Sequence, residues 1–129
     1  MIIDGKKVAQ QIENEIQAKI EKIRGRKPCL AVVLVGNHPA SILYTNRKAE
    51  MCQTVGIKSL KKEFLADVTE EELLKEISSL NEDATVDGIL VQLPLPQHIN
   101  PEKITNHILP KKDVDGFHPM NIGNVLIGE

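Results

Sequence analysis

The stretch CLAVVLV, residues 29–35, is continuously apolar, rich in β-branched residues and followed at once by Gly36. A short apolar run of this kind predicts a strand buried on both faces, because a strand with one face in water alternates polar and apolar residues. Strands buried on both faces belong to parallel sheets that are covered by helices. The run therefore indicates an α/β fold with a parallel sheet at its core.

Helical and strand patterns alternate on both sides of this run. Apolar residues recur every three or four positions in residues 4–24, which predicts a long amphipathic helix packed across one face of the sheet through residues 8–23. The later segments predict a helix at 40–55, a lysine-containing edge strand at 57–64, a helix at 69–80, a buried strand at 86–92 and a short helix at 101–109. Such alternation predicts right-handed crossovers and an αβα sandwich of three or more parallel strands, with helices on both faces. We expect residues 1–129 to form one domain.

The last residues, PMNIGNVLIGE at 119–129, begin a helical pattern with Asn121 as the expected N-cap. The apolar sequence stops after less than two turns, and so short a helix is marginal unless something packs on it. We therefore expect a fragment or a truncated form of a longer protein. The alternative is a complete product whose tail frays.

Composition narrows the function. The chain has 129 residues, a net charge of −2 and 2% aromatic residues, so it lacks the basic stripe and the stacking platforms of nucleic-acid-binding proteins. The opening MIIDGKK has an acid and two lysines where a signal peptide needs an apolar stretch, and no apolar run is long enough to span a membrane, so we expect no targeting or membrane-spanning segment. Two cysteines without disulfide or zinc spacing favour a reducing compartment, the cytoplasm, and the four histidines have no metal-ligand spacing.

The predicted helix 40–55 carries polar residues on the side that should face the sheet. At about 100° per residue, Ser41, Tyr44 and Lys48 share one stripe with Cys52 and Val55. A lone inward lysine usually extends its alkyl stem towards water. Three polar side chains on a buried stripe instead favour a polar cavity.

Two further segments are candidates for a binding site, since ligands of α/β sheets bind beyond the carboxyl ends of the strands. Residues 92–96, QLPLP, place the amide of Gln92 at a strand end and follow it with stiff prolines that can wall a flat pocket. In residues 111–119, KKDVDGFHP, a carboxylate could accept two hydrogen bonds from an aminopyrimidine-like ring. The alternative for residues 92–96 is a plain turn, and the alternative for residues 111–119 is a solvated loop.

The pair Tyr44-x-x-x-Lys48 also resembles the catalytic pair of short-chain dehydrogenases. Those enzymes carry a glycine-rich cofactor turn upstream of the pair, whereas only 43 residues precede Tyr44 and Gly36 stands alone after its strand. We exclude that family, and we assign no nucleotide site to these residues.

Taken together, four motifs resemble the amino-terminal catalytic domain of the bifunctional methylenetetrahydrofolate dehydrogenase/cyclohydrolase family. They are VGNHPAS at 35–41, Tyr44 with Lys48, DGILVQLPLP at 87–96, and KDVDGFHP at 112–119. The resemblance covers essentially the whole chain, including IDGK at 3–6. It implies folate one-carbon chemistry, in which NADP oxidises 5,10-methylene-tetrahydrofolate and the methenyl product is hydrolysed to 10-formyl-tetrahydrofolate.

By motif position, the resemblance implies that Lys48 is the catalytic lysine, that Tyr44 stacks on the folate ring and that Asp115 holds the pterin. Gln92 would hydrogen-bond both Lys48 and the substrate. The implied catalytic residues are Lys48, Tyr44 and Gln92, and the implied substrate-binding residues are these three with Leu93, Pro94 and Asp115. An inward lysine agrees with this role, because burial favours the neutral amine that can accept a proton from an attacking water.

The resemblance further implies that the Rossmann domain that binds NADP in this family is absent from the chain, together with a final helix that returns to the first domain. It implies a homodimeric full-length enzyme. Two other functions remain open, a folate-binding module without catalysis and a structural domain whose lysine is merely packed. Folate binding without turnover would favour the module, and failure of folate to protect the fold against heat would favour the structural domain.

Overall fold

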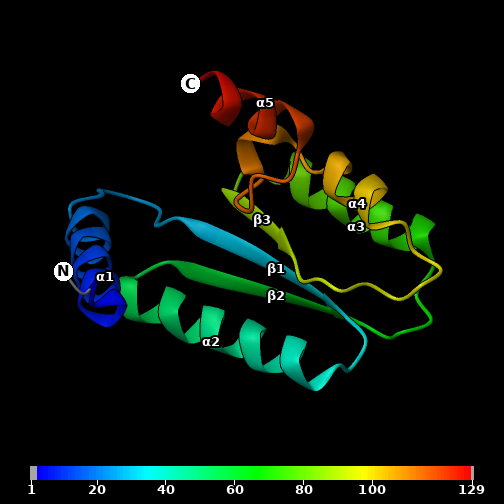
Figure 1. Cartoon of the computed structure of the whole chain (residues 1–129), viewed down its shortest axis with the longest axis horizontal. Coiled ribbons are helices and arrows are strands. Elements are labelled where there is room, and N and C mark those ends of the chain that lie inside the picture. Colours follow the sequence, from blue (N-terminus) through cyan, green and yellow to red (C-terminus); the bar gives the residue numbers. More distant parts are fainter. Residues whose placement is uncertain (1–2, 129) are drawn as a thin grey trace.

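A three-stranded parallel sheet with strand order β2-β1-β3 forms the centre of the computed structural model, which describes residues 3–128 (Figure 1). The strands are β1 (Cys29–Val35), β2 (Lys58–Phe64) and β3 (Gly88–Val91). Both outer strands pair with β1 in parallel. The predicted α/β fold with a parallel core is confirmed, and so is the edge position of the lysine-containing strand.

Helices cover both faces of this sheet. On one face, α3 (Glu70–Glu82) and α4 (Pro101–His107) pack with the odd-numbered side chains of β1 into the main apolar core (Figure 1). Since successive side chains of a strand point to opposite faces, Val32 and Leu34 face the other way, where α2 (Pro39–Val55) contacts the sheet. Strand β1 is therefore buried on both sides, as its apolar run predicted.

Local sequence signals set the ends of these helices. A proline occupies the first turn of α2, and Gly56 ends this helix with a left-handed φ of 86° that a residue with a Cβ rarely adopts. Thr69 and Glu72 form a reciprocal capping box at the start of α3. The side chain of Asn100 accepts hydrogen bonds from the first N–H groups of α4. The predicted helices therefore lie within a few residues of those observed.

The first helix, α1 (Gly5–Glu21), packs against α2 and does not lie across the sheet. It stands beside the amino ends of the strands (Figure 1), and Ile20 is its one buried residue. Val8, Ile12 and Ile16 remain exposed, so the predicted packing of residues 8–23 across one face is wrong. The physical reason is that α2 on one side and α3 with α4 on the other already cover the sheet.

After a 3-10 turn, η1 (Pro110–Lys112), the described chain ends in α5 (Pro119–Ile127). Its N-cap is His118, whose Nδ1 accepts from the N–H of Met120, so the prediction of Asn121 as N-cap is wrong. The proline at the first helical position starts the helix earlier. Asn121 instead donates hydrogen bonds to residues before the helix. The predicted tail extends to Glu129, which lies outside the described residues.

Candidate active site

Lys48 of α2 and Gln92 at the carboxyl end of β3 point towards each other. The Nζ of Lys48 donates a hydrogen bond to Oε1 of Gln92 at 3.1 Å. The backbone N–H of Gln92 donates to the carbonyl of Val33 at 2.8 Å, so this residue continues the pairing of β3 with β1. Its Nε2 donates to the carbonyl of Leu93 at 2.9 Å, which turns the amide oxygen towards the lysine. The amine is therefore held by an amide that is itself fixed to the sheet.

Helical periodicity explains the position of Lys48. The buried residues of α2 are Ser41, Thr45, Cys52 and Val55. Lys48 is half-buried on the same stripe, as predicted. Tyr44, however, is 55% exposed, and the inward position next to it is taken by Thr45, so the prediction that Tyr44 lies on the buried stripe is wrong. One turn before Lys48, the tyrosine ring is open to contact from outside the protein.

Asp115 lies in the loop between η1 and α5, near enough to Lys48 for the positive charge of the lysine to act on its carboxyl group. The residue as a whole is exposed, but partial burial of its carboxyl group raises its pKa above the ordinary value. The positive charge of Lys48 opposes this rise, and the negative charge of Asp113 adds to it. The structure thus joins the amine of Lys48 to the amide of Gln92 by a hydrogen bond, and the carboxyl group of Asp115 lies within reach of the charge of that amine.

The segment after Gln92 borders a hollow of about 400 Å³ beyond the carboxyl ends of β1 and β3. A cis peptide bond joins Leu93 to Pro94. Pro94 and Pro96 line one side of the hollow, and the turn at residues 36–39 lines the other. This is the edge of the sheet at which α/β proteins bind their ligands.

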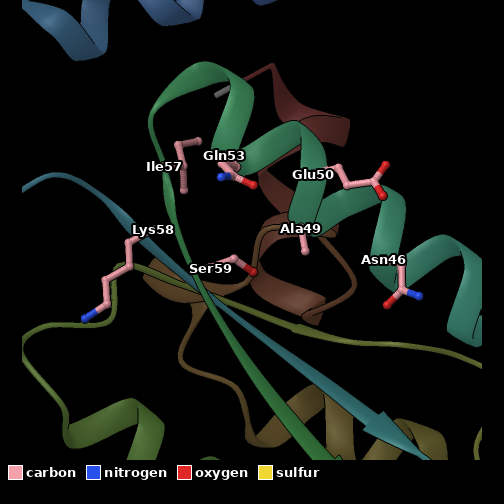
Figure 2. A pocket seen from close by; sticks show the side chains of 7 residues that line it. All are labelled: Asn46, Ala49, Glu50, Gln53, Ile57, Lys58 and Ser59. Carbon is pink, nitrogen blue, oxygen red and sulfur yellow. The ribbon is translucent and has the colours of Figure 1, made fainter.

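A larger hollow of about 520 Å³ lies between α2 and β2 (Figure 2). Its lining residues are Asn46, Ala49, Glu50, Gln53, Ile57, Lys58 and Ser59. The first four lie on the side of α2 away from Lys48. The hollow therefore contains none of the predicted site residues and is separate from the site.

The turn between β1 and α2 does not fit a dinucleotide cofactor. It contains the single glycine Gly36, and Pro39 at the start of α2 removes an N–H donor that a phosphate would use. Among residues 3–128, no group of three or more His, Cys, Asp or Glu side chains could hold a metal ion. Within the same range, no helix combines the length and the apolar content that crossing a membrane requires.

Two residues that support the site were not predicted. The carboxylate of Asp113 accepts hydrogen bonds from the residues that follow it, and an aspartate three positions before a glycine is a known turn signal that could have indicated this. The Nζ of Lys112, a residue only 8% exposed, donates to the carbonyls of Leu80 and Asp83 at 2.9 and 2.8 Å. This lysine ties the start of the loop to the end of α3, and no sequence pattern indicated it.

Known proteins resemble this chain in both sequence and structure. The chain is 56% identical over 129 residues to the bifunctional protein FolD of Protochlamydia amoebophila, covering 100% of this chain and 44% of that protein. The FolD structure of Campylobacter jejuni superposes with a TM-score of 0.94 at 47% identity, covering 97% and 45% of the two chains. The Trypanosoma brucei dehydrogenase-cyclohydrolase, solved with NADP cofactor and inhibitor, has a TM-score of 0.92 at 34% identity, covering 98% and 44%.

This chain therefore spans less than half the length of these relatives. Residues 3–115 match the sequence model described as tetrahydrofolate dehydrogenase/cyclohydrolase, catalytic domain. The match covers both Lys48 and Gln92, which the structure joins by a hydrogen bond, and it ends at Asp115. The chain belongs to the tetrahydrofolate dehydrogenase/cyclohydrolase family.

Proposed function

We propose that this chain forms the folate site of a bifunctional methylenetetrahydrofolate dehydrogenase/cyclohydrolase. The enzyme would oxidise 5,10-methylene-tetrahydrofolate with NADP and hydrolyse the 5,10-methenyl product to 10-formyl-tetrahydrofolate. The observation that carries the proposal is the hydrogen bond between Lys48 and Gln92, which holds a half-buried amine at the carboxyl end of the sheet. A purely packed domain has no need of an amine held there beside a carboxylate.

In this proposal the substrate's flat ring system lies against Tyr44. The exposed tyrosine ring offers a stacking face, and Leu93 with Pro94 walls the other side. The carboxylate of Asp115 accepts two parallel hydrogen bonds from the amino group and the ring N–H of the pterin. The hollow of about 400 Å³ beside Pro94 accommodates a further part of the ligand.

In the hydrolysis step, water adds to the cationic methenyl carbon and loses a proton, and the bond from that carbon to N5 breaks. One water is consumed and one proton is released. Lys48 accepts the proton from the attacking water, because the positive charge of the methenyl bridge disfavours a second positive charge beside it. Gln92 orients the amine by accepting one of its hydrogen bonds.

The remaining properties of the enzyme are proposed on the family resemblance. NADP is the proposed cofactor of the oxidation, and the Trypanosoma brucei relative was solved with NADP. Since the turn after β1 does not fit a dinucleotide, we assign NADP binding to sequence outside the part that this chain shares with its relatives. We also propose one domain over residues 1–129, a homodimeric full-length enzyme and a cytoplasmic location, which the two free buried cysteines suit.

A second candidate is a folate-binding module that does not catalyse either reaction alone. The observation that favours it is that the chain spans less than half the length of its relatives. Both candidates need folate to bind at the same residues. They differ only in whether turnover follows.

Replacement of Lys48 by methionine tests the proposal, because methionine keeps an unbranched stem of similar length and removes the amine. We expect Lys48→Met to bind 5-formyl-tetrahydrofolate in calorimetric titration, and to hydrolyse 5,10-methenyl-tetrahydrofolate about 10²–10⁴-fold more slowly than the parent chain. Lys75→Met is the matched control, since Lys75 lies exposed on α3, where it forms an ion pair with Glu71 one turn away. It should match the parent in both assays.

Three results would count against the proposal in different ways. Unchanged hydrolysis by Lys48→Met would show that the lysine is structural. Folate binding by the parent without turnover would establish the module instead. Absence of folate binding by the parent would remove both candidates.

A further inference from the structure

The carboxylate of Asp113 is the hydrogen-bonding centre of the loop that carries Asp115. Its Oδ1 accepts from the N–H of Gly116 at 3.1 Å. Its Oδ2 accepts from the N–H of His118 at 2.9 Å and from the side-chain amide of Asn121 at 2.9 Å. One side chain thus gathers donors from two residues after the bend and from α5.

The backbone of Asp113 is itself attached to the sheet. It forms an isolated parallel bridge with Ile89 of β3, and its N–H donates to the carbonyl of Leu109 at 3.1 Å. The next residue, Val114, packs so closely on β3 that a Cβ at Gly88 would lie 2.6 Å from its Cγ1. Asp113 therefore provides a fixed point from which the following residues are held.

Asp115 lies between these supports. It is preceded by Val114, which rests on Gly88, and followed by Gly116, which has a φ of 70° and donates to Asp113. Because glycine adopts a positive φ without steric cost, Gly116 permits the bend, and its hydrogen bond to Asp113 holds it in this conformation. Asp115, within this bend, lies near enough to Lys48 for the positive charge of the lysine to act on its carboxyl group.

The charge state of Asp113 suits this role. Burial alone would raise its pKa, but hydrogen bonds from His118, Asn121 and the loop N–H groups outweigh burial and hold the pKa below its ordinary value. The carboxylate is therefore ionised at neutral pH, and a charged acceptor forms stronger hydrogen bonds than a neutral one.

We infer that Asp113 is a positioning residue of the folate site, which acts through Asp115 by holding the loop in the conformation that presents its carboxylate to the pterin. This inference rests on the proposed function, since it takes Asp115 as the pterin anchor. Asp113 makes no contact with the substrate in this role. Its effect on folate binding exists only while Asp115 can accept the hydrogen bonds.

A double-mutant cycle tests this dependence, with 5-formyl-tetrahydrofolate affinity measured by calorimetric titration and the melting temperature of each free protein recorded. We expect Asp113→Asn to weaken binding about tenfold, because an amide cannot accept all three donors and the loop loses its preorganisation. In the Asp115→Asn background, the same substitution should change affinity less than about twofold, since coupled residues are not additive.

Asp4→Asn is the matched control, because Asp4 also accepts from a nearby backbone N–H, that of Lys7, but at the start of α1. It should leave folate affinity unchanged. Asn121→Leu is the second variant, since it removes one of the three donors to the Asp113 carboxylate. It should weaken binding less than Asp113→Asn does, and again only when Asp115 is present.

Equal effects of Asp113→Asn in the two backgrounds, or an effect no larger than that of Asp4→Asn, would overturn the inference. If Asp113→Asn does not fold, the same comparison is made with Asn121→Leu, and equal effects of Asn121→Leu with and without Asp115 would overturn the inference. A parent chain that does not bind the folate would instead refute the proposed function. Weaker binding by Asp115→Asn with unchanged binding by Asp113→Asn would refute only the positioning role.

Discussion

Asp87 joins the amino ends of two strands through a single carboxylate. Its oxygens accept from the guanidinium of Arg26 at 2.6 and 2.9 Å, and Oδ2 also accepts from the N–H of Cys29 at 2.8 Å. The hydrogen bonds from Arg26 and then that from Cys29 lower the pKa of Asp87 to about 2. The folded state therefore binds a proton at this site less readily than the unfolded chain does.

This difference predicts an acid-dependent loss of stability. The contribution of Asp87 is complete above the ordinary value of 3.8 and is lost as the pH falls through about 2. We expect Asp87→Asn to unfold at lower urea concentration than the parent at pH 7, with the difference shrinking as the pH is lowered towards 2. Asp67→Asn, at an exposed loop position, serves as the control. A difference that stays constant with pH would show that the carboxylate charge is not its source.

The inward position of Lys48 could be predicted from the sequence, whereas the exposure of Tyr44 could not. A helical period identifies the middle of an apolar stripe well, and Lys48 lies there between buried residues. Tyr44 lies at the edge of that stripe, where packing against the neighbouring elements decides which residue is covered. In the structure the buried residue is Thr45 and not Tyr44.

At the scale of elements, α1 and α3 have similar amphipathic patterns but different contributions to the core. In α3, Leu73, Ile77 and Leu80 are buried against the sheet and α4. In α1 only Ile20 is buried. The free energy of unfolding should therefore depend on α3 far more than on α1.

Matched isoleucine substitutions measure this difference. Ile77 is fully buried, so Ile77→Ala should cost about 2–5 kcal/mol through lost burial and the cavity left behind. Ile12 is 51% exposed, so Ile12→Ala should change stability by no more than about 0.5 kcal/mol. Urea-induced unfolding of the 129-residue chain gives both values. Similar losses for the two variants would mean that the stripe of α1 is covered in solution.

The sequence was sufficient to predict the type and order of the long elements, since periodicity and local caps decide these. It was not sufficient to predict what α1 packs against, because periodicity marks an apolar face without naming its partner. The start of α5 was also mispredicted. Asn121 has the side chain of an N-cap, but its hydrogen bonds go to Pro110 and Asp113, and Pro119 starts the helix.

At the scale of the whole molecule, the strand order β2-β1-β3 creates the site. It places the end of β3 next to β1, and α2 crosses back over the sheet to bring Lys48 to Gln92 (Figure 1). Parallel strands with right-handed crossovers predict that their carboxyl ends share one edge. The segments after β1 and β3 could therefore be predicted from the sequence as parts of the binding site.

The loop that carries Asp115 could not be assigned to the site from the sequence in the same way. The path of the loop to Asp115 depends on the bridge between Ile89 and Asp113 and on hydrogen bonds to the Asp113 carboxylate. Neither the bridge nor these hydrogen bonds produce a periodic pattern in the sequence. For this loop only the resemblance to the folate family indicated a role.

A crystal structure of the chain with 5-formyl-tetrahydrofolate would test the central claim most directly. We expect the pterin to stack on Tyr44, its amino edge to lie within hydrogen-bond distance of the Asp115 carboxylate, and Nζ of Lys48 to face the N5 side of the ring. A folate bound in the hollow between α2 and β2, or one whose pterin leaves Asp115 without contact, would contradict it.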